Sequence, residues 1–182
     1  MAEIFDARAE CVFEGKNILF DTNVWISIYG NDPTGEHAVY SDFYRSAIKN
    51  KNSIVTNSLI ISELFNRMCK IEYELLFGKE EYHLLKERRK SDADYVERVE
   101  SVRDTCLNVL DDCSFLCREV NAASLGGHLE AAAKGNLDLT DAALVECCIS
   151  KDLIFVTHDK DFEGIDFKLV TANRGILKRA GL

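Results

Sequence analysis

Short apolar runs alternate with longer amphipathic stretches along most of this chain. The runs predict buried strands over residues 17–20, 53–56, 114–117 and 153–157, with a fifth candidate strand over 167–170. The run at 153–157 is as apolar as strands that are covered on both faces of a sheet. Residues 1–16 are mixed and polar, and they predict an irregular arm.

Helices are predicted between these runs. They cover residues 22–29, 34–49 after a break at 30–33, 58–71 with Asn57 or Ser58 as cap, 80–110, 121–134 before Gly135 and Asn136, and 141–150 capped by Thr140. The second half of 80–110 carries apolar residues four and three apart, a stripe that packs on the body or on a partner helix. This order of strands and helices predicts one α/β domain, with a mainly parallel sheet and right-handed crossovers.

Composition narrows the class of protein. The chain has 182 residues, of which 47% are hydrophobic, and this is enough for one domain with a sizeable core. No apolar run has membrane-spanning length and the start lacks a secretory signal, so we expect a soluble cytoplasmic protein. Seven cysteines without regular spacing predict buried thiols rather than disulfides or a zinc site. The net charge of −9 opposes non-specific nucleic-acid binding, so a nuclease would need local basic charge or a second subunit.

Four acidic residues lie beside apolar runs: Asp21, Glu63, Asp141 and Asp159. Asp21 and Asp159 follow predicted strands, and Glu63 and Asp141 lie early in predicted helices. Because ligands bind at the carboxyl ends of parallel strands, all four can meet at one edge of the sheet. Clustered carboxylates repel each other unless a cation or a proton neutralises them.

This arrangement suits hydrolysis of phosphodiester bonds with Mg²⁺ or Mn²⁺. Such ions prefer oxygen ligands, and they stabilise both the attacking and the leaving oxygen. Each acid taken alone has a simpler interpretation. Asp21 could be a helix cap, Asp141 a first-turn Asp and Asp159 a loop acid, while Glu63 could be a solvated helix residue. It is the order and the context of all four that favour the metal site.

The chain resembles the PIN-domain family of ribonucleases, including the VapC-like toxins of bacterial toxin–antitoxin pairs. The motifs that carry the resemblance are Asp21-Thr22-Asn23 after an apolar strand, Ser62-Glu63-Leu64, Thr140-Asp141-Ala142, and Thr157-His158-Asp159-Lys160-Asp161-Phe162. The resemblance covers about residues 17–170. It implies a Mg²⁺- or Mn²⁺-dependent endoribonuclease with the four acids as metal ligands. It also implies a homodimer and, for a toxin, an antitoxin that inserts a basic side chain among the carboxylates.

The resemblance also assigns supporting roles. Asn23 and Thr157 would hold the metal ligands by hydrogen bonds, and Asp161 would either join them or cap the following turn. Asp138 is expected to be a loop acid.

An extended helical segment at about 78–112 departs from small family members. Its basic residues Lys86, Arg88, Arg89 and Lys90 are either an RNA contact or a solvated helix face.

Two other functions remain open. A catalytically silent PIN-like protein would bind RNA or act as a scaffold. A phosphatase with Asp21 as nucleophile is disfavoured, because such enzymes usually have a second Asp where Asn23 stands.

Overall fold

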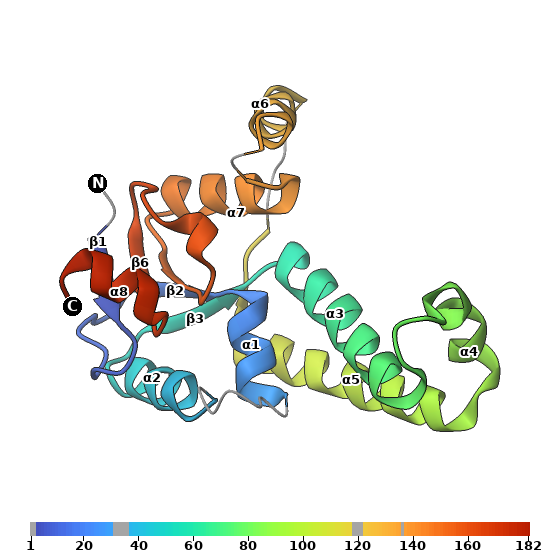
Figure 1. Cartoon of the computed structure of the whole chain (residues 1–182). Coiled ribbons are helices and arrows are strands. Elements are labelled where there is room, and N and C mark those ends of the chain that lie inside the picture. Colours follow the sequence, from blue (N-terminus) through green and yellow to red (C-terminus); the bar gives the residue numbers. More distant parts are fainter. Residues whose placement is uncertain (1–2, 31–36, 118–121, 136) are drawn as a thin grey trace.

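The protein is described by a computed structural model that covers residues 3–30, 37–117, 122–135 and 137–182, without the side chain of His37 (Figure 1). In these residues the strands form a sheet in the order β1-β6-β5-β2-β3-β4, and every pair of neighbours is parallel. The strands are β1 Glu3–Asp6, β2 Asn17–Phe20, β3 Ser53–Thr56, β4 Ser114–Phe115, β5 Ile154–Val156 and β6 Lys168–Thr171. The predicted α/β class with a parallel sheet is confirmed.

The central strands β2 and β5 pair directly, and they form the core of the sheet. Ile18, Leu19 and Phe20 of β2 and Phe155 and Val156 of β5 are all 0% exposed. Helices therefore cover both faces of these strands, as their unbroken apolar sequences predict. The pairing also brings the carboxyl ends of β2 and β5 side by side.

Strand β1 corrects the prediction of an irregular arm at residues 1–16. It pairs in parallel with β6, with Ile4 opposite Leu169 and Phe5 opposite Val170. Its two apolar residues stand between Glu3 and Asp6, so the sequence does not show the longer apolar run of a central strand. A half-buried edge strand needs only this much apolar surface. Residues 1 and 2 lie outside the described part of the chain.

Helices cover the two faces of the sheet. The helices are α1 Thr22–Tyr29, α2 His37–Lys49, α3 Ser58–Phe77, α4 Leu85–Ser91, α5 Ala93–Asp112, α6 Ala122–Ala133, α7 Leu139–Ser150 and α8 Arg174–Ala180, with 3-10 turns η1 Tyr82–Leu84 and η2 Lys160–Phe162. Helices α1 and α2 lie on one side of the sheet and α7 on the other, with α6 packed against α7 (Figure 1). None of the helices within the described ranges is both long and apolar enough to cross a membrane.

Several predicted boundaries shift. Strand β4 ends at Phe115, β5 is one residue shorter than predicted at each end, and β6 is shifted by one residue toward the C-terminus. Helix α7 begins at Leu139 because Asp138, rather than Thr140, is its cap. Helix α8 was not predicted, since only the basic character of the tail was apparent. The predicted break at residues 31–33, the start of the 34–49 helix, Asn121 and Asn136 lie outside the described residues.

The segment after α3 is not one continuous helix. The predicted 80–110 stretch divides at Asp92, whose side chain caps α5 by accepting a hydrogen bond from the backbone N–H of Tyr95 at 3.0 Å. Helices α3 and α5 pack together and extend away from the sheet, and α4 lies at their outer end (Figure 1). We call α3, α4, α5 and η1 the helical arm. The predicted stripe on α5 is its buried face, with Tyr95 and Val109 0% exposed.

The cysteines agree with the prediction of free thiols. Cys11, Cys69, Cys106, Cys147 and Cys148 are buried, Cys113 is half-buried and Cys117 is exposed. None of the seven forms a disulfide.

Candidate active site

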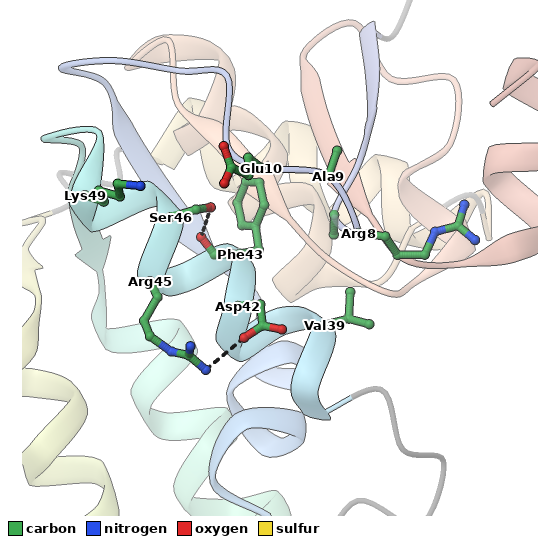
Figure 2. A pocket seen from close by; sticks show the side chains of 10 residues that line it. Arg8, Ala9, Glu10, Val39, Asp42, Phe43, Arg45, Ser46 and Lys49 are labelled. Atoms are coloured by element: carbon green, nitrogen blue, oxygen red, sulfur yellow. Dashed lines mark hydrogen bonds and ion pairs between the residues drawn. The ribbon is translucent and has the colours of Figure 1, made fainter.

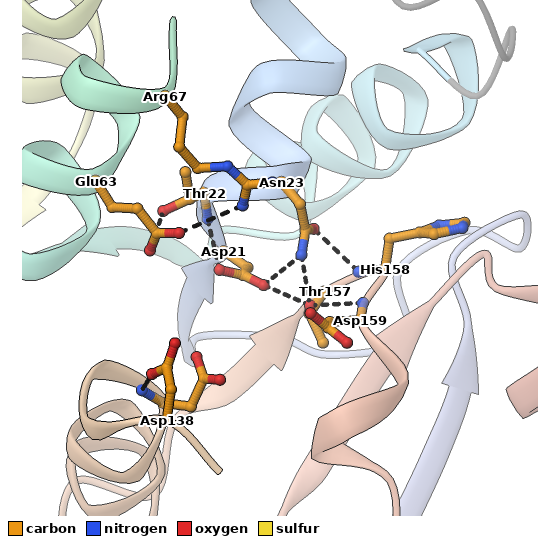
Figure 3. Close-up of polar contacts among 10 residues, drawn as sticks. Asp21, Thr22, Asn23, Glu63, Arg67, Asp138, Thr157, His158 and Asp159 are labelled. Carbon is orange, nitrogen blue, oxygen red and sulfur yellow. Dashed lines mark hydrogen bonds and ion pairs between the residues drawn. The ribbon is translucent and has the colours of Figure 1, made fainter. Parts of the chain in front are cut away.

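Asp21 lies where β2 ends and α1 begins, at the carboxyl edge of the sheet (Figure 3). Its side chain is held by three hydrogen bonds. One oxygen accepts from the backbone N–H of Thr22 at 2.7 Å. The other accepts from the amide of Asn23 at 2.6 Å and from the hydroxyl of Thr157 at 2.5 Å. Asp21 is only 6% exposed, so these bonds compensate a carboxylate that has left water.

Thr157 connects the ends of β2 and β5. Its buried hydroxyl donates to Asp21 and accepts from the amide of Asn23 at 3.1 Å and from the backbone N–H of Asp159 at 3.0 Å. The Asn23 side-chain carbonyl in turn accepts from the backbone N–H of His158 at 3.1 Å. Asn23 and Thr157 therefore hydrogen-bond both to Asp21 and to the segment after β5, and their role in supporting metal ligands stays a prediction.

Glu63 reaches the same edge from the second turn of α3. One carboxylate oxygen accepts a hydrogen bond from the Thr22 hydroxyl at 3.1 Å. The other lies 3.3 Å from the guanidinium of Arg67, one turn further along α3. The α1–α3 contact thus brings Glu63 beside the segment that carries Asp21.

Asp141 approaches from the opposite side, in the first turn of α7. Its backbone N–H donates to the carboxylate of Asp138 at 2.8 Å, so Asp138 is the cap of α7 and not a simple loop acid. Figure 3 shows Asp138 at this edge, at the start of the helix. Asp138 therefore adds a fifth acid to the edge where the sequence predicts four.

Asp159 completes the group after β5. It caps η2 by accepting from the backbone N–H of Asp161 at 3.0 Å. The sequence leaves two roles open for Asp161, a supporting contact to the metal ligands or a cap of the turn. The residue that caps η2 is Asp159. Asp161 contributes its backbone N–H, and its side chain is exposed.

Burial and mutual repulsion raise the pKa of two of these carboxyls. The pKa of Asp21 rises to about 6, mainly through burial, with a further contribution from Glu63 and Asp159 and an opposing one from the Thr157 and Thr22 hydrogen bonds. The pKa of Asp141 rises to about 7, through burial first and then the charges of Asp138, Asp21, Asp159 and Glu63. Glu63 and Asp159 therefore lie close enough for their charges to affect the ionisation of both Asp21 and Asp141.

The PIN domain family model matches residues 18–168 of the chain, which include all four predicted acids.

The chain belongs to the PIN-domain family.

Two solved structures are similar to this chain at low sequence identity. One chain of the VapBC2 complex from Rickettsia felis, bound to a DNA fragment from its promoter, is 15% identical with a TM-score of 0.53. That match covers 85% of this chain and 96% of the other. PAE2754 from Pyrobaculum aerophilum is 18% identical with a TM-score of 0.48, over 96% and 99% of the two chains. No curated protein matches this chain. PIN domains are generally nucleases.

The acids of this PIN domain provide only oxygen donors, and these suit a hard divalent cation. Within the described ranges, however, no group of three His, Cys, Asp or Glu side chains is arranged to hold a metal ion as it stands. The contacts of the acids explain why their side chains do not converge on one point. Both oxygens of Asp21 accept hydrogen bonds, Glu63 is turned to Thr22 and Arg67, and the charges repel each other. The donor set fits the ion chemically, but its members are not drawn together.

Sequence reasoning missed three contacts of the site. Arg67 follows Glu63 by four residues, a helical spacing that could have indicated the pair. The hydroxyl of Tyr40 on α2 accepts from the backbone N–H of Ala172 at 3.1 Å and lies 2.9 Å from Nδ1 of His158. No local pattern signals this second contact, because it joins residues far apart in the chain. The third is the Asp138 cap.

The basic residues of the helical arm are only partly available to RNA. Arg88 forms an ion pair with Glu81, and its guanidinium lies 3.8 Å from the ring centre of Phe77. The guanidinium of Arg89 lies 5.5 Å from the ring centre of Phe65. Lys86 and Lys90 are exposed on α4, at the outer end of the arm. The two arginines therefore have structural contacts, and the lysines remain the accessible part of the predicted RNA contact.

Proposed function

We propose that this PIN domain is a Mg²⁺- or Mn²⁺-dependent endoribonuclease that uses Asp21, Glu63, Asp141 and Asp159. The observation that carries the proposal is the meeting of these four acids at one sheet edge, where the pKa values of Asp21 and Asp141 rise to about 6 and about 7. Burying a carboxylate and placing it beside other carboxylates both cost free energy when no cation is present. A divalent cation would remove the repulsion and keep all four ionised.

The four carboxylates would hold the ion. When bound, such an ion stabilises charge on the phosphate oxygens and lowers the pKa of a coordinated water. The Asp21 carboxylate is already oriented for this role by Thr22, Asn23 and Thr157. Its neighbours would therefore not need to reorganise it during the reaction.

We further propose that the protein acts as the toxin of a toxin–antitoxin pair. Support comes from the four motifs, which resemble those of VapC-like toxins, and from the likeness of the fold to a chain of the VapBC2 complex. An antitoxin would place an arginine among the carboxylates, because arginine pairs with a carboxylate through two hydrogen bonds. A homodimer would bring basic charge from a second subunit toward the acidic edge, and light scattering on the eluted protein would test this.

The experiment is cleavage of a pool of structured RNAs in Mn²⁺, in Mg²⁺ and in EDTA. Wild type is compared with Asp21→Asn and Asp159→Asn, and with Asp104→Asn as a matched control. Asp104 is an exposed acid on α5 outside the site. We expect cleavage by wild type and Asp104→Asn only, and only with metal.

Cleavage that persists in Asp21→Asn would refute the assignment of the site. RNA binding by wild type without any turnover would instead support the second candidate, a silent PIN-like binding protein. The observation that favours this second candidate is that the acids, as they stand, are not arranged to hold an ion.

A further inference from the structure

The acidic edge raises an electrostatic problem for an RNA substrate. Five carboxylates lie there, and the whole chain has 31 acidic against 22 basic Lys and Arg residues. RNA approaches as a polyanion, and its affinity for proteins comes largely from cations that contact phosphates. A metal ion neutralises part of the charge at the bond that is cut. The phosphates next to that bond still face a negative surface.

Arg67 can supply positive charge beside the acidic edge. It lies on α3 one turn beyond Glu63, with its guanidinium 3.3 Å from the Glu63 carboxylate. Among the side chains drawn in Figure 3 it is the one with a permanent positive charge, and it points into the group of acids. Its side chain is 53% exposed, so a ligand in the site can reach it.

The Arg67–Glu63 contact stabilises the fold only weakly. It is an exposed pair four residues apart on a helix, 35% exposed on the Glu63 side, and pairs of this kind contribute little to stability. A phosphate offers a guanidinium two parallel hydrogen bonds and a stronger charge. If Glu63 turns to a metal ion, it also leaves the guanidinium available.

We propose that Arg67 binds the RNA phosphate next to the scissile bond and positions the strand across the acidic edge. This inference rests on the proposed nuclease function. The guanidinium contacts Glu63, and it takes no part in the hydrogen bonds described above for Asp21, Asp141 and Asp159, so it lies at the Glu63 side of the acids. A position at one side of the acids favours the neighbouring phosphate over the one that reacts. The basic residues of α4 lie at the outer end of the arm and cannot replace it there.

The test measures binding of a fluorescent 12-nucleotide single-stranded RNA in Mg²⁺. All proteins carry Asp21→Asn to prevent cleavage, and Kd is measured from 50 to 300 mM salt. Arg67→Gln removes the charge and Arg67→Lys retains it. Arg45→Gln is the matched control, because Arg45 forms a comparable exposed pair with Asp42, at 2.8 Å, in the cleft beside α2 (Figure 2).

We expect Arg67→Gln to raise Kd roughly tenfold, equal to the loss of one charged contact. The slope of log K against log salt should fall by about 0.7, the value for one phosphate on a single strand. Arg67→Lys should keep that slope, and Arg45→Gln should match the parent. If Arg67 had only a structural role, Arg67→Gln would leave the salt slope unchanged. Arg67→Lys would then have no lost slope to restore.

Cleavage by proteins with an intact Asp21 gives the second readout. Arg67→Gln should raise KM with little change in kcat, because a flanking phosphate is bound equally in the ground state and the transition state. An unchanged KM and an unchanged salt slope, with wild type active, would overturn the role of Arg67 and leave the nuclease proposal standing. If wild type neither binds nor cleaves RNA, the proposed function fails and this inference fails with it.

Discussion

Replacing Asp21 with asparagine should change how the stability of the metal-free protein depends on pH. Asp21 is 6% exposed, and burial together with the charges of Glu63 and Asp159 raises its pKa from 3.8 to about 6. The folded state therefore binds a proton more tightly than the unfolded state does. Stability from this group is fully present below pH 3.8, and it is lost as the pH rises through about 6. The Asp21→Asn variant has no carboxyl group at this position, so its stability does not fall in this way.

The size of the effect follows from the shift. The pKa difference of 6 minus 3.8 is about 2.2 units, and at 1.36 kcal/mol per unit it corresponds to about 3 kcal/mol in the free energy of unfolding. About 2 kcal/mol of this loss falls between pH 4.5 and pH 8. The variant also changes hydrogen bonds with Thr157 and Asn23. Those changes do not depend on pH, so they cancel when the two proteins are compared across the range.

The assay is urea unfolding in EDTA at pH 4.5, 6 and 8 for wild type, Asp21→Asn and Asp104→Asn. We expect the stability of Asp21→Asn relative to wild type to increase by about 2 kcal/mol from pH 4.5 to pH 8. Asp104→Asn should follow wild type. A difference between Asp21→Asn and wild type that stays constant with pH would show that the fold does not resist ionisation of Asp21. Added Mg²⁺ should stabilise wild type more than the variant.

Two further substitutions test the contacts that support the site. Thr157→Val should cost about 1–2 kcal/mol of stability and raise the pKa of Asp21 further, because it removes a hydrogen bond to the ionised carboxylate. Thr157→Ser is its control, and urea unfolding at several pH values measures both effects. Asp138→Ala should cost about 1 kcal/mol by removing the cap of α7, whereas Thr140→Ala, at the position that the sequence favoured, should be nearly neutral in the same assay. Equal losses in the two variants would contradict the observed cap.

The central part of the fold could be predicted because its signals are local. Strands β2 and β3 coincide with the predicted apolar runs, since a strand covered on both faces must be apolar throughout. Strand β1 was missed because an edge strand buries only a few side chains. The break between α4 and α5 was not predicted, because neither proline nor glycine marks it. It is made by Asp92, whose side chain accepts a hydrogen bond from the backbone N–H of Tyr95.

In the candidate site, too, the features with local signals could be predicted and those that depend on tertiary packing could not. Each predicted acid stands next to a recognisable strand or helix end, so a parallel sheet brings the four together. The contact between Tyr40 and His158 joins α2 to the segment after β5, and the same hydroxyl accepts a hydrogen bond from the backbone N–H of Ala172, directly after β6. Both contacts depend on tertiary packing, which no local pattern in the sequence shows. Thr140 and Asp138 are both suitable caps by residue type. Only the backbone direction at the start of α7 decides between them.

The contacts of the acids indicate how the proposed metal site would respond to an ion. The Asp21 side chain accepts three hydrogen bonds, two from Thr22 and Asn23 of α1 and one from Thr157 directly after β5. Glu63 is held only by side chains, those of Thr22 and Arg67. Moving Asp21 would break a buried network, whereas moving Glu63 exchanges two partly exposed contacts for stronger ones. An arriving cation would therefore keep Asp21 in place and draw Glu63 toward it. The same movement would release Arg67, so ion binding and the reception of an RNA phosphate would be coupled through one side chain.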